Sequence, residues 1–140
     1  MFKATGIIDE FLTEKELKHG VNDLGELTVV EAGFSGNNGT CKLNIISSDD
    51  DNDAQVRSAP IAKCPEDKRG AACELLNSLN SRFRFPKFVM DKDGDITVQY
   101  DIPLKVPDDA LGDIAMELLI RISHIADEAY PEIMRFIWGS

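Results

Sequence analysis

The sequence is poor in the residues that build metal centres and redox sites. It has 140 residues but contains three cysteines and two histidines, and no two cysteines stand in a C-x-x-C pattern. Zinc sites and thioredoxin-like redox sites usually need such a pattern, so neither is indicated and no cofactor is expected. We expect Cys41, Cys64 and Cys73 to be reduced and buried, because a free thiol packs as a small apolar group.

Long apolar runs are also missing. The longest apolar stretch, "IAMELLIRISHIA", is interrupted by Glu117, Arg121 and His124, so it cannot span a membrane. The first residues, "MFKATGIIDEFL", carry one lysine and then acids where a signal peptide would have a long apolar core. These features predict a cytoplasmic protein that has no membrane partner.

Basic residues are outnumbered throughout the chain. There are 15 lysines and arginines against 25 aspartates and glutamates, which gives a net charge of -10. Such a surface repels phosphate backbones, and the densest basic stretch, "SRFRFPK", is more typical of a solvated edge than of a nucleic-acid site. We therefore predict no nucleic-acid partner. The acidic charge suits basic partners or serves solubility.

What the sequence does contain is a series of helical and strand periodicities. Residues 6–20 predict a first helix of about ten to fourteen residues, which has Thr13 near its end or at a kink and is ended by His19 and Gly20. Alternating patterns predict strands at residues 26–34, 40–46, 55–64, 87–91 and 95–104, and further helices at residues 64–83 and 107–138. Strands grouped in runs between helices indicate the α+β class, with a five-stranded antiparallel sheet packed by helices in the order α-β-β-β-α-β-β-α.

Two prolines qualify this prediction. Pro60 removes a backbone donor, so the third strand should lie at an edge of the sheet or carry a bulge. Pro131 should kink the last helix, but the apolar stripe keeps its phase across it, which favours one bent helix over two. Straight, about thirty residues at about 1.5 Å each would reach roughly 45 Å, enough to cross the face of the sheet.

Two aspartate-rich segments invite a calcium hypothesis that their spacing does not support. In "SSDDDNDA", counting from Asp49 puts Ala54 where the loop needs glycine and Pro60 where it needs glutamate. In "VMDKDGDITVQY", glycine falls at the fourth position of the loop, and its twelfth is Ile102. The Asp-Gly pair at 93 and 94 instead favours a tight hairpin turn. We expect a solvated loop and a turn, and no metal site.

No catalytic pattern emerges from the remaining polar residues. Ser123, His124 and Asp127 suggest a triad, but adjacent residues on a helix point about 100° apart, so Ser123 does not face His124. The stretch "GFSGNNG" is rich in glycine but lies between strands, without the helix N-terminus that a phosphate cradle needs. We predict that the chain is not an enzyme.

The order of the elements carries a family resemblance. The stretch "LLNSLN" leads into "FRFPKFVMDKDGDITVQYDIPL" and then into a long, acid-capped helix. In this the chain resembles the YbjN family, described as bacterial sensory transduction regulators, whose fold is similar to that of type III secretion chaperones. The resemblance covers nearly all of the chain and implies a single domain over residues 1–140. It also implies a small binding or regulatory module that forms a homodimer, without known catalytic residues.

Two functional hypotheses follow. The first is a non-enzymatic module that works as a homodimer and engages a protein client or regulatory partner. The side chains expected to make these contacts are apolar residues of the first helix and of the C-terminal segment: Ile7, Phe11, Leu12, Tyr130, Phe136 and Trp138. Core packing is the alternative role for each of them. The second hypothesis is a sensor that holds a small molecule between the sheet and the long helix.

Overall fold

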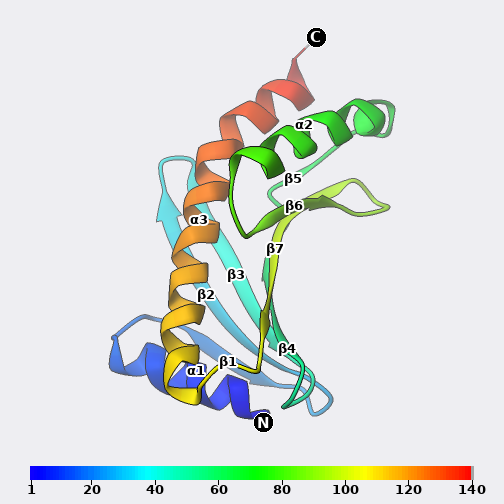
Figure 1. Ribbon diagram of the computed structural model, residues 1–140. Coiled ribbons are helices and arrows are strands. Elements are labelled where there is room, and N and C mark those ends of the chain that lie inside the picture. Colours follow the sequence, from blue (N-terminus) through cyan, green and yellow to red (C-terminus); the bar gives the residue numbers. More distant parts are fainter. Residues whose placement is uncertain (140) are drawn as a thin grey trace.

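A single antiparallel sheet and three α-helices make up residues 1–139, which are the residues that the computed structural model describes (Figure 1). The helices are α1 (Lys3–Glu14), α2 (Arg69–Arg82) and α3 (Asp108–Trp138), and a 3-10 turn, Glu66–Lys68, leads into α2. The strands are β1 (Gly20–Asp23), β2 (Thr28–Gly36), β3 (Gly39–Ser47), β4 (Asp53–Ser58), β5 (Ala62–Lys63), β6 (Lys87–Met90) and β7 (Asp95–Pro103). The α+β class is confirmed, but the sheet has seven strands within these residues and not five.

The first additional strand is β1, which follows α1 after a sharp reversal. Helix α1 ends at Glu14, and Glu16 has a left-handed backbone with a φ of 58°. The prediction that His19 and Gly20 end the helix is therefore wrong, because Gly20 already pairs with Glu31 of β2. Strand β1 was missed because Val21 is its single apolar residue, so it has no alternation to detect.

The second additional strand arises because Pro60 divides the third predicted strand. Strand β4 ends at Ser58 in the middle of the sheet, between β3 and β7, and β5 pairs with β7 at the end of the strand order. The break would leave the Val98 N–H of β7 without a partner, but the Ser58 Oγ accepts its hydrogen bond at 2.8 Å. Pro60 thus breaks the strand completely, where a bulge or an edge position was predicted.

Helix α3 covers one face of the sheet along its length. It continues through Pro131 without a break, as predicted, and its 31 residues span about 46 Å at about 1.5 Å each. In Figure 1, α1 lies beside the first turns of α3, and α2 lies beside its last turns. The core between sheet and helices is built from the inward residues of the strands and the matching stripe of α3, among them Val30, Leu43, Val56, Val98, Leu119 and Ile122.

Helix α1 meets α3 at a glycine. A Cβ atom placed on Gly112 of α3 would stand 2.3 Å from the Cγ atom of Phe11, so the Phe11 ring lies directly on the backbone of α3. The Lys15 ammonium lies 5.4 Å from the centre of the same ring. The close approach of the two helices therefore depends on the absence of a side chain at position 112.

Hydrogen bonds of the His19 side chain stabilise the connection from α1 to β1. The side chain is 8% exposed, its Nε2 atom lies 2.7 Å from the Asp9 Oδ1 atom, and its Nδ1 atom lies 2.7 Å from the Leu17 carbonyl oxygen. Both contacts are to acceptors, so the doubly protonated ring satisfies both at once. Burial lowers the pKa of His19, but the bonds to Leu17 and Asp9 outweigh it, and the pKa is raised overall.

The Asp-Gly turn between β6 and β7 forms as predicted. Gly94 has a φ of +86°, and the Asp91 carboxylate accepts bonds from the backbone N–H groups of Asp93 and Asp95. Arg69, at the start of α2, donates to the carbonyl oxygens of Lys92 and Asp93 at 3.2 and 2.9 Å. The aspartates of this segment thus shape a turn that α2 holds in place.

The Asn80 side chain joins α2 to the outer edge of β6 by hydrogen bonds. Its Oδ1 atom accepts the Phe88 N–H at 2.7 Å, and its Nδ2 atom donates to the Phe88 carbonyl at 3.1 Å. The side chain therefore makes the pair of bonds that a neighbouring strand would make.

Candidate functional site

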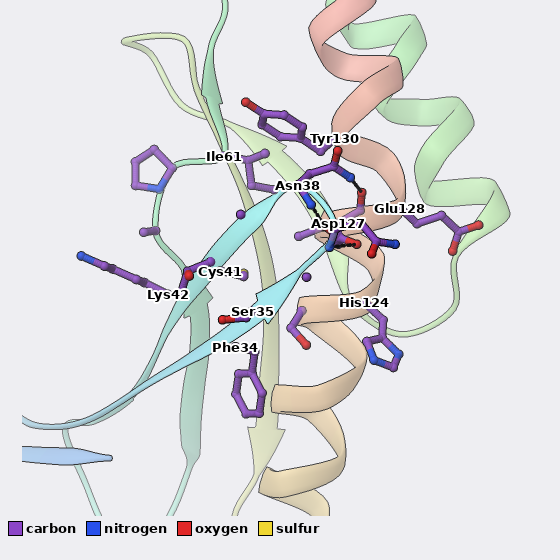
Figure 2. A pocket seen from close by; sticks show the side chains of 18 residues that line it. Phe34, Ser35, Asn38, Cys41, Lys42, Ile61, His124, Asp127, Glu128 and Tyr130 are labelled. Carbon is purple, nitrogen blue, oxygen red and sulfur yellow. Dashed lines mark hydrogen bonds between the residues drawn. The ribbon is translucent and has the colours of Figure 1, made fainter. Parts of the chain in front are cut away.

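A cavity lies where the tip of the β2–β3 hairpin meets α3 and the β4–β5 link (Figure 2). Its volume is about 580 Å³. Residues 34–42 of the hairpin form one wall, residues 59–61 form a second, and α3 contributes side chains from Ser123 to Tyr130. A volume of this size is within the range of pockets that hold small molecules.

Asp127 of α3 holds the hairpin tip against the helix. Its two carboxylate oxygens accept the backbone N–H groups of Asn37 at 3.1 Å and Asn38 at 2.8 Å, and its own carbonyl accepts the Asn38 side-chain amide at 2.9 Å. A Cβ atom on Gly36 would stand 2.6 Å from the Asp127 Cγ atom, so the glycine permits this approach. The bond from the Asn38 N–H is the main cause that lowers the pKa of Asp127.

Cys41 lies in the wall of the cavity. Burial raises the pKa of its thiol, and the negative charge of Asp127 raises it further, so the thiol stays protonated and is a weak nucleophile at neutral pH. All three cysteines are free, which agrees with the expected reduced state. Cys64 is buried as predicted, but Cys41 is only half-buried. Cys73 is exposed, because it lies on the face of α2 away from the buried stripe.

The three residues that suggest a triad have separate roles. The Ser123 Oγ donates to the Ile120 carbonyl of its own helix at 2.8 Å, and the Asp127 carboxylate is bonded to the hairpin turn. The exposed His124 ring points away from that turn in Figure 2. The arrangement gives Ser123 no base to activate it, so these residues do not form a nucleophilic triad.

The structure does not bring the predicted contact residues together. Ile7 and Phe11 are half-buried beside the first turns of α3, and Leu12 is fully buried in the core, where a partner cannot reach it. Tyr130 and Phe136 are half-buried near the other end of α3. Trp138 differs from all of these, because 81% of its surface is exposed.

Sequence reasoning missed most of the residues around the cavity. The stretch "GFSGNNG" was placed between two strands, and Asp127 was considered together with His124, but nothing in the sequence paired the turn with the helix. The distance between them in the chain is 89 or 90 residues, so local periodicity carries no information about it. The glycine-rich pattern of "GFSGNNG" was the available signal, since glycine often marks a close backbone approach.

Residues 1–139 contain neither a cluster of metal ligands nor a membrane-spanning helix. Within that range no group of three or more histidine, cysteine, aspartate or glutamate side chains is arranged to hold a metal ion. In the same range no helix is both long enough and apolar enough to cross a membrane.

Comparison with known families settles the relationship that the order of elements suggested. The sequence profile of the YbjN family, described as "Putative bacterial sensory transduction regulator", matches residues 6–134. The chain belongs to the YbjN family. A search of curated proteins finds no match. The matched range of YbjN includes all seven strands, the whole cavity and Asp127, and it ends before Trp138.

Proposed function

We propose that this YbjN protein is a non-enzymatic regulatory module of the cytoplasm that binds protein and acts as a homodimer. Family membership supports the regulatory role. The observation that carries the proposal is the exposure of Trp138 at the end of α3, since a tryptophan that is 81% exposed is a typical anchor for a protein interface. A second copy of this chain is the proposed partner at this tip.

The tip of α3 is held rigidly, which favours binding. The Lys68 ammonium donates to the carbonyl oxygens of Phe136, Ile137 and Gly139 at 3.0, 2.8 and 2.8 Å, and it lies 5.9 Å from the centre of the Phe136 ring. The carbonyls of Phe136 and Ile137, in the last turn of the helix, therefore each accept a bond from a cation. A side chain on a fixed helix end loses less conformational entropy on binding than one on a mobile tail.

Light scattering coupled to size exclusion tests the homodimer directly. We expect a mass near 31 kDa at micromolar concentration, twice the 15.5 kDa of one chain. The change Trp138→Ala should shift the mass towards the monomer. Leu24→Ala is the matched control, because Leu24 is 67% exposed at the β1–β2 turn, away from the tip. A monomer at all concentrations up to tens of micromolar would contradict the homodimer.

The cavity beside Asp127 favours a second candidate function, a sensor for a small molecule. Its size and its position between sheet and helix match the site that such a sensor needs. A thermal-shift screen with nucleotides, amino acids and metal ions tests it, since a ligand that prefers the folded state raises the melting temperature. We expect Ser35→Phe, which fills part of the cavity, to abolish any shift. A shift that persists in this variant would place the ligand elsewhere.

A further inference from the structure

Phe85 has a strained backbone that its burial does not explain. Its φ is +69°, a left-handed conformation that bulky side chains rarely adopt, and it directly precedes Pro86. Such strain costs on the order of 1–3 kcal/mol and persists where the surrounding structure enforces it. The ring is nevertheless 54% exposed, so the burial of the ring offsets little of this strain.

The neighbours of Phe85 hold its ring beside α3. The Arg121 guanidinium lies 5.0 Å from the ring centre, and the Tyr100 ring of β7 meets it edge-on at 6.2 Å. The same Arg121 lines a second hollow of about 500 Å³ on α3. Phe85 therefore lies next to this hollow through the shared neighbour Arg121, although it is not one of the lining residues. We term the hollow the α3 groove.

The α3 groove follows a single stripe of the helix. Its other lining residues are Phe83, Glu117, Ile120, His124, Ile125 and Glu128, and those from α3 recur at spacings of three and four. Ile120 is 38% exposed, although most apolar residues of α3 are buried. The groove thus has an apolar centre that the chain itself leaves uncovered.

Charge indicates what this groove can bind. Glu117 and Glu128 lie at its two ends, eleven residues or about 16 Å apart along the helix. Arg121 and Glu117 compensate each other, because the Arg121 NH2 group bonds to the Glu117 carboxylate at 2.9 Å, so the uncompensated charge among the lining residues is that of Glu128. On a chain of net charge -10, a second copy would bring further acid to this site. A segment with basic residues around an apolar anchor is complementary to it.

We propose that the α3 groove binds a protein segment in which lysine or arginine flanks an apolar anchor. The anchor packs on Ile120, which is 38% exposed, and a basic flank lies near Glu128. This inference rests on the proposed function as a protein-binding module and deepens it, but it does not depend on the homodimer. It uses the mode in which a groove on one helix accepts an amphipathic segment.

Two synthetic peptides test this inference. One is a twelve-residue helix former of leucine, alanine and lysine whose leucines recur at spacings of three and four, and the other has glutamate in place of each lysine. Amide chemical shifts of the labelled full chain report where each peptide binds. We expect the lysine peptide to shift the amides of Phe83, Phe85, Ile120 and His124, and the glutamate peptide to shift none. Binding of both peptides, or shifts concentrated at residues 49–53 of the acidic loop, would overturn the proposal.

Variants make this test specific to the groove. Ile120→Asp should weaken binding of the lysine peptide at least tenfold, and Glu128→Lys should weaken it by a similar factor at low salt. Leu24→Asp is the control and should bind as the unchanged chain does. If Ile120→Asp does not fold, the test rests on Glu128→Lys, which should fold because Glu128 is exposed on the helix surface. Unchanged affinity in the folded groove variants refutes the groove.

The same samples separate this inference from the proposed homodimer. Peptide binding to a chain that scatters as a monomer would contradict the homodimer and support the groove. A dimer that binds neither peptide would contradict the groove and leave the homodimer in place.

Discussion

The contact between Phe11 and Gly112 gives the sharpest prediction for packing. Replacing an exposed helical glycine by alanine usually stabilises a protein by about 0.5–1 kcal/mol. At position 112 the added methyl group would stand 2.3 Å from the Phe11 Cγ atom, so the ring has to move. Overpacking of this kind costs about 1–3 kcal/mol. We therefore expect Gly112→Ala to lower the free energy of unfolding by about 1–2 kcal/mol.

Urea unfolding followed by circular dichroism measures this change. At an m-value of about 2 kcal/mol/M, the midpoint should fall by about 0.5–1 M. Gly70→Ala is the matched control, because Gly70 is an exposed glycine of α2 with no atom within 4 Å of the position of an added Cβ. It should raise the midpoint slightly.

A double-mutant cycle identifies the cause. Phe11→Ala removes the ring, and in that background Gly112→Ala should become stabilising by about 0.5–1 kcal/mol, as in an ordinary helix. If Gly112→Ala stabilises the unchanged chain as much as Gly70→Ala does, the packing assigned to Phe11 is wrong. In that case Phe11 would again be available as a contact residue for a partner.

Three further predictions concern polar contacts. Because the pKa of His19 is raised in the folded chain, its contribution to stability is present in full below about pH 6.5 and is lost as pH rises through the folded pKa. Nuclear magnetic resonance should show that the ring titrates at a higher pH than a free histidine. The variant His19→Gln should remove this pH dependence of unfolding. The pKa of Asp127 is lowered in the folded chain, so its contribution to stability is lost as the pH falls and the carboxylate is protonated. The variant Asp127→Ala should speed hydrogen exchange of the Asn38 amide without unfolding the core. The variant Asn80→Ala leaves the N–H and the carbonyl group of Phe88 without the side-chain amide that binds them, and it should lower the stability of the protein in thermal unfolding by about 1–2 kcal/mol. An unchanged melting temperature would show that water replaces the amide.

The elements that the sequence predicted well are those whose periodicity is long and clear. The stripe of α3 keeps its phase for 31 residues, so a proline inside it did not hide the helix. The turn at Asp93-Gly94 was predictable because glycine readily takes the positive φ that Gly94 has, whereas Asp93 keeps a negative φ. Strand β1 was not predictable, since Val21 is its single apolar residue, and β5 was predicted only as part of the strand that Pro60 divides. Their existence depends on pairing with strands that were already in place.

The candidate site was less accessible to sequence reasoning for a related reason. The cavity, the contact of Asp127 with the hairpin and the groove beside Phe85 all join segments that are far apart in the chain. The exposure of single side chains could not be predicted either, because the sequence does not show whether the sheet covers a given apolar residue of a helix. Leu12 and Trp138 were predicted alike, and one is fully buried while the other is the most exposed large apolar side chain described.

The position of α3 after the strands has a consequence for how the chain is made. All seven strands described precede it, and the inward faces of β2, β3 and β4 are covered by a helix that leaves the ribosome after them. Until residues 108–138 emerge, the nascent sheet has its apolar side open to water. The cell must therefore shield a partly formed protein during synthesis, and a ribosome that stalls before Asp108 leaves a product that is prone to aggregate.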